Sequence, residues 1–168
     1  IIGRGWGQGT QHSQSLQSLF SHVPGLKVVM PATPYDAKGL LISSVSDDNP
    51  VIFIEHRKLY DIKGEVHEKF YKITLGKADI KRKGRDITIV ALSQMVLEAE
   101  KAANLRLKQG IDAEIIDLRT VNPLDQDLIF NSVKKTHRLI VVDTSWLNCG
   151  IASEVSGRVA QNVFNYLK

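Results

Sequence analysis

Short runs of apolar, often β-branched residues alternate along the chain with segments in which apolar residues recur every three or four positions. Continuous apolar runs of this length are typical of strands buried on both faces of a sheet. We predict five such strands, at 26–30, 51–54, 87–92, 113–118 and 139–142. The recurring spacing predicts helices at 16–20, 37–45, 96–107, 128–133 and 151–163. Strands that alternate with helices indicate an α/β fold with a mainly parallel sheet and helices on both faces.

The polar stretch 57–85 interrupts this alternation, because it is rich in Lys and has no sustained apolar period. It predicts an interdomain linker, which we place at 61–75. Only two strands precede the linker, too few for an independent sheet of this type. Residues 1–60 are therefore expected to be the C-terminal part of one domain, and 76–168 a second domain. The chain opens at Ile1 without an initiating Met, which favours a piece of a longer protein.

Composition narrows the classes of function. The formal net charge is +4, from 22 basic and 18 acidic residues. The densest basic run, Lys81-Arg82-Lys83, has no interleaved aromatic residues, so we expect no nucleic-acid partner. No apolar run is long enough to span a bilayer, and we expect no membrane partner. The single cysteine, Cys149, cannot form an internal disulfide, which favours a cytoplasmic location.

Candidate chemistry begins with a glycine-rich segment. Residues 3–9 carry glycine at every second position and lead to His12 in the opening turn of a predicted helix. The spacing does not match G-x-G-x-x-G, which argues against a dinucleotide-binding domain. A flexible backbone can approach a ligand, and an imidazole can accept or donate a proton near neutral pH, so His12 is a candidate catalytic residue. A structural interpretation, in which His12 caps the helix or packs against Leu16, stays open.

The other histidines have no glycine-rich approach, and we interpret them as structural: His22, His56, His67 and His137.

A second polar stretch, 43–50, lies where a helix is expected to end and a buried strand to begin. Helix-terminal carbonyls with nearby Asp and Asn oxygens can bind a hard cation. Asp and Asn before Pro are also common turn formers, so a simple turn remains the alternative.

Two further sets of polar residues follow predicted strands, at the carboxyl ends where open α/β sheets usually bind ligands. The first set is Asp117, Arg119 and Thr120; the second is Asp143, Thr144, Ser145 and Trp146. A structural ion pair between Asp117 and Arg119 is the competing interpretation. Cys149 has no evident base partner, so we do not expect a nucleophile there.

The order of these motifs resembles the β subunit of the decarboxylating component of pyruvate, branched-chain 2-oxo acid or acetoin dehydrogenase complexes, in the transketolase superfamily. The resemblance covers essentially the whole chain, and the Gln-His-Ser-Gln form distinguishes these subunits from transketolases, which carry His-Asp there. The matching segments are Gln11-His12-Ser13-Gln14, 22–31, 36–40, 47–60, 75–78, 117–124 and 149–154.

The resemblance implies the fold and the site. Residues 1–60 would be the C-terminal part of a pyrimidine-binding domain, and 76–168 a transketolase C-terminal domain. His12 would be the active-site histidine that faces the thiamine-bound intermediate. A structural potassium ion would be held by the carbonyls of Ser44 and Val45 with Asp47 and Asn49.

The reaction implied is oxidative decarboxylation of a 2-oxo acid on thiamine diphosphate, with transfer of the acyl group to lipoamide. The implied partners are an α subunit that shares the cofactor and holds its magnesium, a second β subunit and a lipoyl acyltransferase core. Because the activating glutamate and the diphosphate motif are not in this sequence, the isolated chain is expected to be inactive. The alternatives are a non-catalytic assembly module, or another enzyme of the transketolase superfamily.

Overall fold

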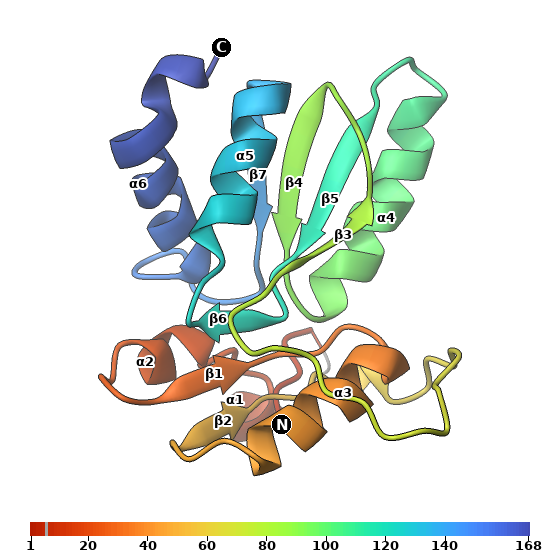
Figure 1. Ribbon diagram of the computed structural model, residues 1–168, viewed down its shortest axis with the longest axis vertical. Helices are drawn as coiled ribbons and strands as arrows, with labels where there is room; N and C mark the ends of the chain where they lie inside the picture. The colour runs from red at the N-terminus through yellow and green to blue at the C-terminus, as the bar shows by residue number, and fades with distance from the viewer. Residues whose placement is uncertain (6) are drawn as a thin grey trace.

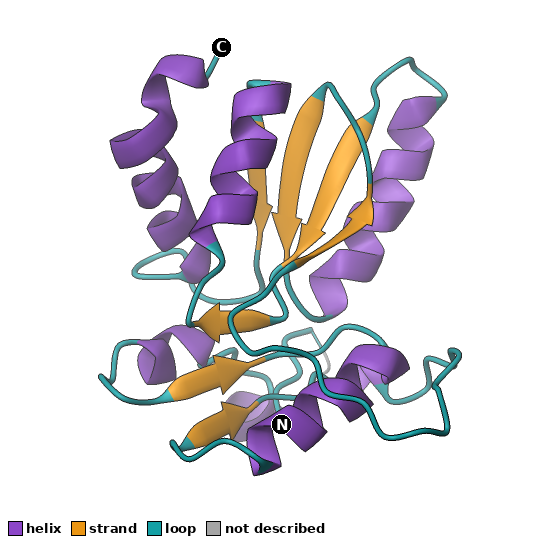
Figure 2. Ribbon diagram, viewed as in Figure 1, coloured by secondary structure: helices purple, strands orange, loops and turns teal. Residues whose placement is uncertain are grey.

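The computed structural model describes residues 1–5 and 7–168, which form two stacked layers, each built on its own sheet (Figure 1). The chain starts in the lower layer of that view and ends at the top of the upper layer. The strands of the two sheets run in clearly different directions (Figure 2).

The lower sheet has three strands in the order β2-β1-β6. Strand β1 (Lys27–Val29) pairs in parallel with β2 (Val51–Phe53) and antiparallel with β6 (Thr120–Asn122). Helix α3 (Pro34–Val45) packs on one face through Leu40, while α2 (Gln17–Ser21) lies against β1 and β6. Strand β6 therefore completes a sheet whose other strands lie about seventy residues or more earlier in the sequence.

The upper sheet has four strands in the order β3-β5-β4-β7. Strand β4 (Ile87–Ala91) runs parallel to both β5 (Ala113–Asp117) and β7 (Leu139–Val142), and only the edge strand β3 (Asp79–Arg82) is antiparallel. The carboxyl ends of the parallel strands point toward the lower layer (Figure 1). Ligand-binding side chains of an open α/β sheet are expected at that edge.

Three helices cover the upper sheet. Helix α4 (Gln94–Leu107) packs on one face, and α5 (Gln126–Thr136) and α6 (Ile151–Val163) pack on the other. The remaining described elements are single turns: α1 (Gly9–His12), η1 (Arg57–Leu59) and η2 (Phe164–Tyr166).

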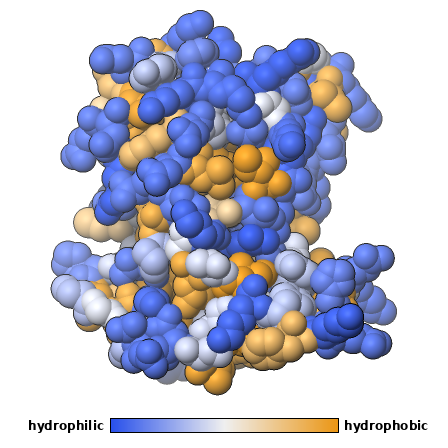
Figure 3. All heavy atoms as spheres, viewed as in Figure 1, coloured by the Kyte–Doolittle hydropathy of each residue, from blue (hydrophilic) through white to orange (hydrophobic). Residues whose placement is uncertain are grey.

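One hydrophobic core joins the two layers. Val28 and Met30 of the lower layer pack in the same cluster as Leu118 and Val121, which follow β5, and as buried residues of α5 and α6. Met30 is fully buried, and burying a side chain of this size contributes roughly 1.5–3 kcal/mol. On the face drawn in Figure 3, hydrophobic residues gather near the middle, within a mostly hydrophilic surface.

The expected α/β class with a mainly parallel sheet is confirmed, and each of the five predicted strands and five predicted helices is present within a few residues. Two strands were missed. Strand β3 lies in the polar stretch 57–85 and is an edge strand with only intermediate burial, and β6 has only three residues. Among the described residues, no helix combines the length and apolarity needed to cross a membrane.

Candidate functional site

The glycine-rich segment has an unusual backbone. Gly5, Gly7 and Gly9 all have positive φ angles, between 67° and 80°, a region that residues other than glycine rarely adopt. A Cβ atom on Gly7 or Gly9 would meet no other described residue within 4 Å, so the space beside this backbone is open on the side of the described chain. A ligand can therefore approach the main chain closely there.

His12 is exposed and ends the single-turn helix α1. The prediction that it opens a longer helix is wrong, because the chain bends after His12 and a separate helix, α2, begins at Gln17. The bend coincides with the hydroxyl of Ser15, which donates to Oγ1 of Thr144 at 2.9 Å. The imidazole is consequently presented to solvent rather than packed on a helix.

The stretch after β7 holds this region in place. Asp143 accepts a hydrogen bond from Nε2 of the fully buried Gln17 at 2.6 Å and from the backbone N–H of Ser145 at 3.1 Å. The guanidinium group of Arg4 donates to the carbonyl oxygens of Thr144 at 2.7 Å and Ser145 at 2.9 Å. Nothing local in the sequence marked Arg4, Ser15 or Gln17, because their partners lie 126 to 141 residues away along the chain.

The other predicted set at the carboxyl strand ends belongs to a separate network. Oδ1 of Asp117 accepts the N–H of Arg119 at 3.0 Å, and the hydroxyl of Thr120 donates to the carbonyl oxygen of Pro123 at 2.9 Å. Trp146, the last residue of the predicted set that begins at Asp143, is 71% exposed. The two sets thus have different partners, and only the set that includes Asp143 contacts the His12 region.

Asp117 and Arg119 are part of a buried ionic cluster between the layers, together with Asp36 on α3 and with Asp79 and Lys81 on β3. Nζ of Lys81 lies 2.7 Å from Oδ2 of Asp36, 2.9 Å from Oδ2 of Asp79 and 3.6 Å from Oδ2 of Asp117. Arg119 reaches Asp36 at 2.6 Å and Asp79 at 3.0 Å. Three carboxylates face two cations, so the cluster carries one excess negative charge when all five groups are ionised.

Burial and ion pairing shift the pKa values of the cluster residues in different directions. Burial raises the pKa of Asp117 to about 7, although Lys81 offsets part of the rise. For Asp36, burial is outweighed by hydrogen bonds from Lys81 and Thr33, so its pKa is lowered. For Lys81, burial is outweighed by the neighbouring carboxylates, so its pKa is raised. Protonation of Asp117 is the natural way to remove the excess charge.

The residues predicted to hold a cation lie together at the end of α3. Both carboxylate oxygens of Asp47, however, already accept hydrogen bonds from the protein. Oδ2 accepts from Nζ of Lys27 at 2.5 Å, and Oδ1 accepts from both nitrogens of Asn49. The hydrogen bond from Lys27, followed by those from Asn49, lowers the pKa of Asp47 to about 2. The carbonyl oxygen of Ser44 accepts the N–H of Asp47 at 3.4 Å. The side chains therefore fit a cation poorly, which leaves backbone carbonyls as the available donors.

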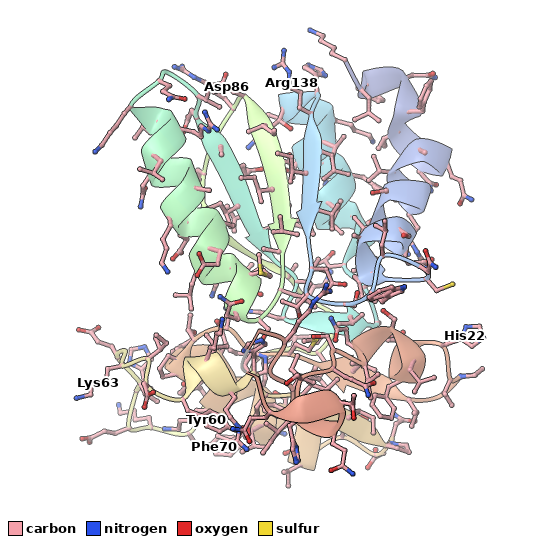
Figure 4. The ribbon with its side chains drawn as sticks, turned by 180° about the vertical axis from the view of Figure 1, so that it is seen from behind. His22, Tyr60, Lys63, Phe70, Asp86 and Arg138 are labelled. Carbon is pink, nitrogen blue, oxygen red and sulfur yellow. The ribbon has the colours of Figure 1, made fainter. Side chains whose placement is uncertain are left out.

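The remaining histidines occupy varied settings. His22 lies at the outer edge of the molecule (Figure 4). His56 is almost fully buried, and burial, with a smaller effect of Lys58, lowers its pKa. His67 makes edge contacts with Tyr35 and Tyr71, and Nδ1 of His137 lies 2.8 Å from the carbonyl oxygen of Tyr166.

Cys149 is exposed and has a positive φ of 56°. A pocket of about 220 Å³ lies between the start of α3 and the region 55–62, lined in part by His56 and Tyr60. It is smaller than the roughly 300–1,000 Å³ of ordinary ligand pockets.

Comparisons with known proteins identify the fold and the family of the chain. The family model of the transketolase pyrimidine binding domain matches residues 2–63, and that of the transketolase C-terminal domain matches residues 76–168. A solved structure described as a split gene transketolase, inactive beta4 tetramer, superposes with a TM-score of 0.80 over 90% of this chain and 50% of that chain. At 23% sequence identity this likeness shows the fold alone.

Curated relatives extend the comparison. The chain is 51% identical over its full length to the acetoin:2,6-dichlorophenolindophenol oxidoreductase subunit beta of Cupriavidus necator, of which it spans 50%. It is 52% identical, over 88% of its length, to the pyruvate dehydrogenase E1 component subunit beta of Bacillus subtilis, of which it spans 46%. The chain thus spans about half the length of the curated relatives it matches. With one family model matching more than half of its residues and a second matching most of the remainder, the chain belongs to the transketolase family.

Proposed function

We propose that the chain is part of the β subunit of a thiamine diphosphate-dependent 2-oxo acid dehydrogenase, which decarboxylates a 2-oxo acid and passes the acyl group to lipoamide. The curated relatives support this proposal, since they are named as β subunits of an acetoin oxidoreductase and of the pyruvate dehydrogenase E1 component. The structural observation that carries it is the exposed imidazole of His12 at the end of a glycine-rich segment with open space beside its backbone.

His12 is the proposed proton-transfer group. An exposed imidazole can take up a proton at one ring nitrogen and release it during the next step near neutral pH. Bound thiamine diphosphate would supply the electron sink for the loss of carbon dioxide. The part of this chain is to present the imidazole at the reacting centre and to leave the backbone of Gly7 and Gly9 accessible. These features fit one wall of a cofactor site.

The other walls are proposed to come from partner chains. An α subunit would hold the diphosphate and its magnesium ion, and a second β subunit and a lipoyl acyltransferase core would complete the assembly. The support is the similarity to relatives that are themselves named as subunits. On this proposal the isolated chain is inactive, and the single exposed Cys149 suits a reducing, cytoplasmic setting.

Potassium at Ser44, Val45, Asp47 and Asn49 stays a prediction. Because Lys27 already pairs with the Asp47 carboxylate, an ion there would depend on the two helix-end carbonyls.

The test uses the full-length β subunit assembled with its α subunit. Reduction of an artificial dye acceptor with pyruvate or acetoin reports the early steps, and acylation of a lipoyl domain reports the complete transfer. His12→Ala should lower acyl transfer roughly 10²–10⁴-fold, the usual contribution of a positioned acid-base group. His22→Ala, which changes another exposed histidine, is the matched control and should retain the wild-type rate. Wild-type transfer by His12→Ala would overturn the role assigned to His12.

Calorimetry of the isolated 168-residue chain with thiamine diphosphate and Mg²⁺ examines the shared nature of the site. We expect no tight binding. A dissociation constant in the micromolar range would contradict the proposal that other chains supply most of the site.

A further inference from the structure

We infer that Asp143, Thr144 and Ser145, here called the 143–145 turn, are positioning residues that fix His12 from the other layer of the molecule. This inference rests on the proposed function of His12. The 143–145 turn follows β7, at the carboxyl edge of the upper sheet that points toward the lower layer (Figure 1). It contacts the chain on both sides of His12.

The contact before His12 is made by Arg4. Its NH1 atom donates to two successive carbonyl oxygens of the turn, Thr144 at 2.7 Å and Ser145 at 2.9 Å. A charged donor shared by two carbonyls holds both the distance and the direction of the glycine-rich segment as it leaves the lower layer.

The contacts after His12 are made by Ser15 and Gln17. Oγ of Ser15 donates to Oγ1 of Thr144 at 2.9 Å, and Nε2 of Gln17 donates to Oδ1 of Asp143 at 2.6 Å. Gln17 is fully buried, so its amide cannot exchange this partner for water without moving the helix that carries it. Asp143 is itself oriented by the N–H and hydroxyl groups of Ser145.

Among the described residues between these anchors, which are 5 and 7–14, ordering contacts are few. Helix α1 is one turn long, has no buried residue and no side-chain cap. The glycines before it lose more conformational entropy on ordering than any other residue. Two hydrogen bonds close the loop around His12: the N–H of Gln8 donates to Oγ of Ser13 at 3.0 Å, and the N–H of Ser13 donates to the carbonyl oxygen of Gly9 at 3.2 Å. The position of His12 is therefore set mainly where the loop is tied at its two ends.

On this inference the two layers have different roles. The lower layer carries the imidazole, and the upper layer determines where the imidazole stands relative to the cofactor. A positioning role predicts that weakening the 143–145 turn reduces only the part of catalysis that passes through His12.

The test again uses the full-length β subunit with its α subunit. Thr144→Val removes the hydroxyl at nearly constant volume, and Gln17→Met removes the buried amide while keeping the length of the side chain. Ser153→Ala is the matched control, because Oγ of Ser153 donates to the carbonyl oxygen of Leu147, farther along the same loop and outside the 143–145 turn. Thermal melts show whether each variant folds. If Gln17→Met does not fold, Thr144→Val alone decides.

The first readout is hydrogen–deuterium exchange, which does not depend on activity. Thr144→Val and Gln17→Met should speed amide exchange in residues 7–14 by about fivefold to tenfold, the effect of losing one hydrogen bond. Ser153→Ala should leave this exchange at the wild-type rate. Unchanged exchange in both test variants would overturn the inference.

The second readout is a double-mutant comparison. In the wild-type background each test variant should lower kcat with KM for the 2-oxo acid unchanged, whereas in the His12→Ala background it should lower kcat no further. An equal fractional loss in both backgrounds would show a general structural effect and would overturn the positioning role. If His12→Ala itself has no effect, the proposed function fails, while the exchange data still decide whether the turn holds the segment.

Discussion

The ammonium group of Lys81 on β3 lies 2.7 Å from the carboxylate of Asp36 in the first turn of α3. This contact joins the two layers, because α3 covers the lower sheet and β3 is the edge of the upper one. Asp36 is fully buried, and Thr33 donates a hydrogen bond to the same oxygen at 2.6 Å. The ionic cluster thus links the two layers through buried ion pairs.

Asp117 should make stability depend on pH. Its pKa is about 7 in the folded chain, against an ordinary value of 3.8. Between these values the folded chain holds the proton and the unfolded chain does not, so the contribution of Asp117 to the free energy of unfolding falls as pH rises from about 4 to about 7. Asp117→Asn should remove this slope and be more stable than wild type above neutral pH, by on the order of a few kcal/mol.

Urea denaturation at a series of pH values measures this slope. Asp127→Asn, an exposed carboxylate in the first turn of α5, is the control and should keep the wild-type slope. Parallel pH profiles for wild type and Asp117→Asn would contradict the raised pKa.

Lys81→Met should be strongly destabilising. The substitution leaves three carboxylates facing the single guanidinium group of Arg119, and breaking a buried pair by removing one partner costs about 3–5 kcal/mol. Adding Asp117→Asn should recover part of this loss, because it removes one of the unpaired charges. Equilibrium unfolding of both variants checks this prediction, which fails if the double variant is no more stable than Lys81→Met.

Two glycines should respond oppositely to alanine. A Cβ on Gly84 would lie 2.2 Å from the carbonyl carbon of Ala113, and this backbone belongs to a strand paired on both sides, so Gly84→Ala should be destabilising. A Cβ on Gly157, within α6, would meet nothing within 4 Å, so Gly157→Ala should stabilise the helix by about 1 kcal/mol. Melting temperatures that shift in the same direction for both variants would be inconsistent with this packing.

Lys27 should control the response of the α3 end to potassium. In the wild-type chain the Asp47 carboxylate is paired, so exchanging KCl for choline chloride should change the melting temperature little. In Lys27→Met the carboxylate is freed beside the helix-end carbonyls, and KCl should then raise the melting temperature. A large potassium effect in wild type, or none in Lys27→Met, would show that Lys27 does not compete with the ion.

The sequence predicted the parts of the fold that rest on local pattern. A mostly apolar, β-branched run such as 87–92 favours a strand buried on both faces of a sheet, and it forms β4. Strand β3, Asp-Ile-Lys-Arg, carried no such signal, because Asp79 and Lys81 belong to the ionic cluster and their partners lie far away in the sequence. The candidate site divides in the same way. His12 was predicted from the adjacent glycines and stays a prediction, whereas Arg4 and Gln17 have ordinary local surroundings and partners more than 120 residues away in the sequence.

Strand β6 carries a lesson for protein engineering. It lies deep in the second half of the sequence, yet it forms the antiparallel border of β1, and the amide of Asn122 reaches back to the carbonyl oxygen of Leu26 at 2.7 Å. A chimera that joins two homologues near residue 75 would therefore pair a foreign strand with the native one inside a single sheet. A hybrid that keeps the lower sheet intact therefore needs residues 27–53 and 120–122 from the same parent, even though the two segments lie on opposite sides of the predicted linker.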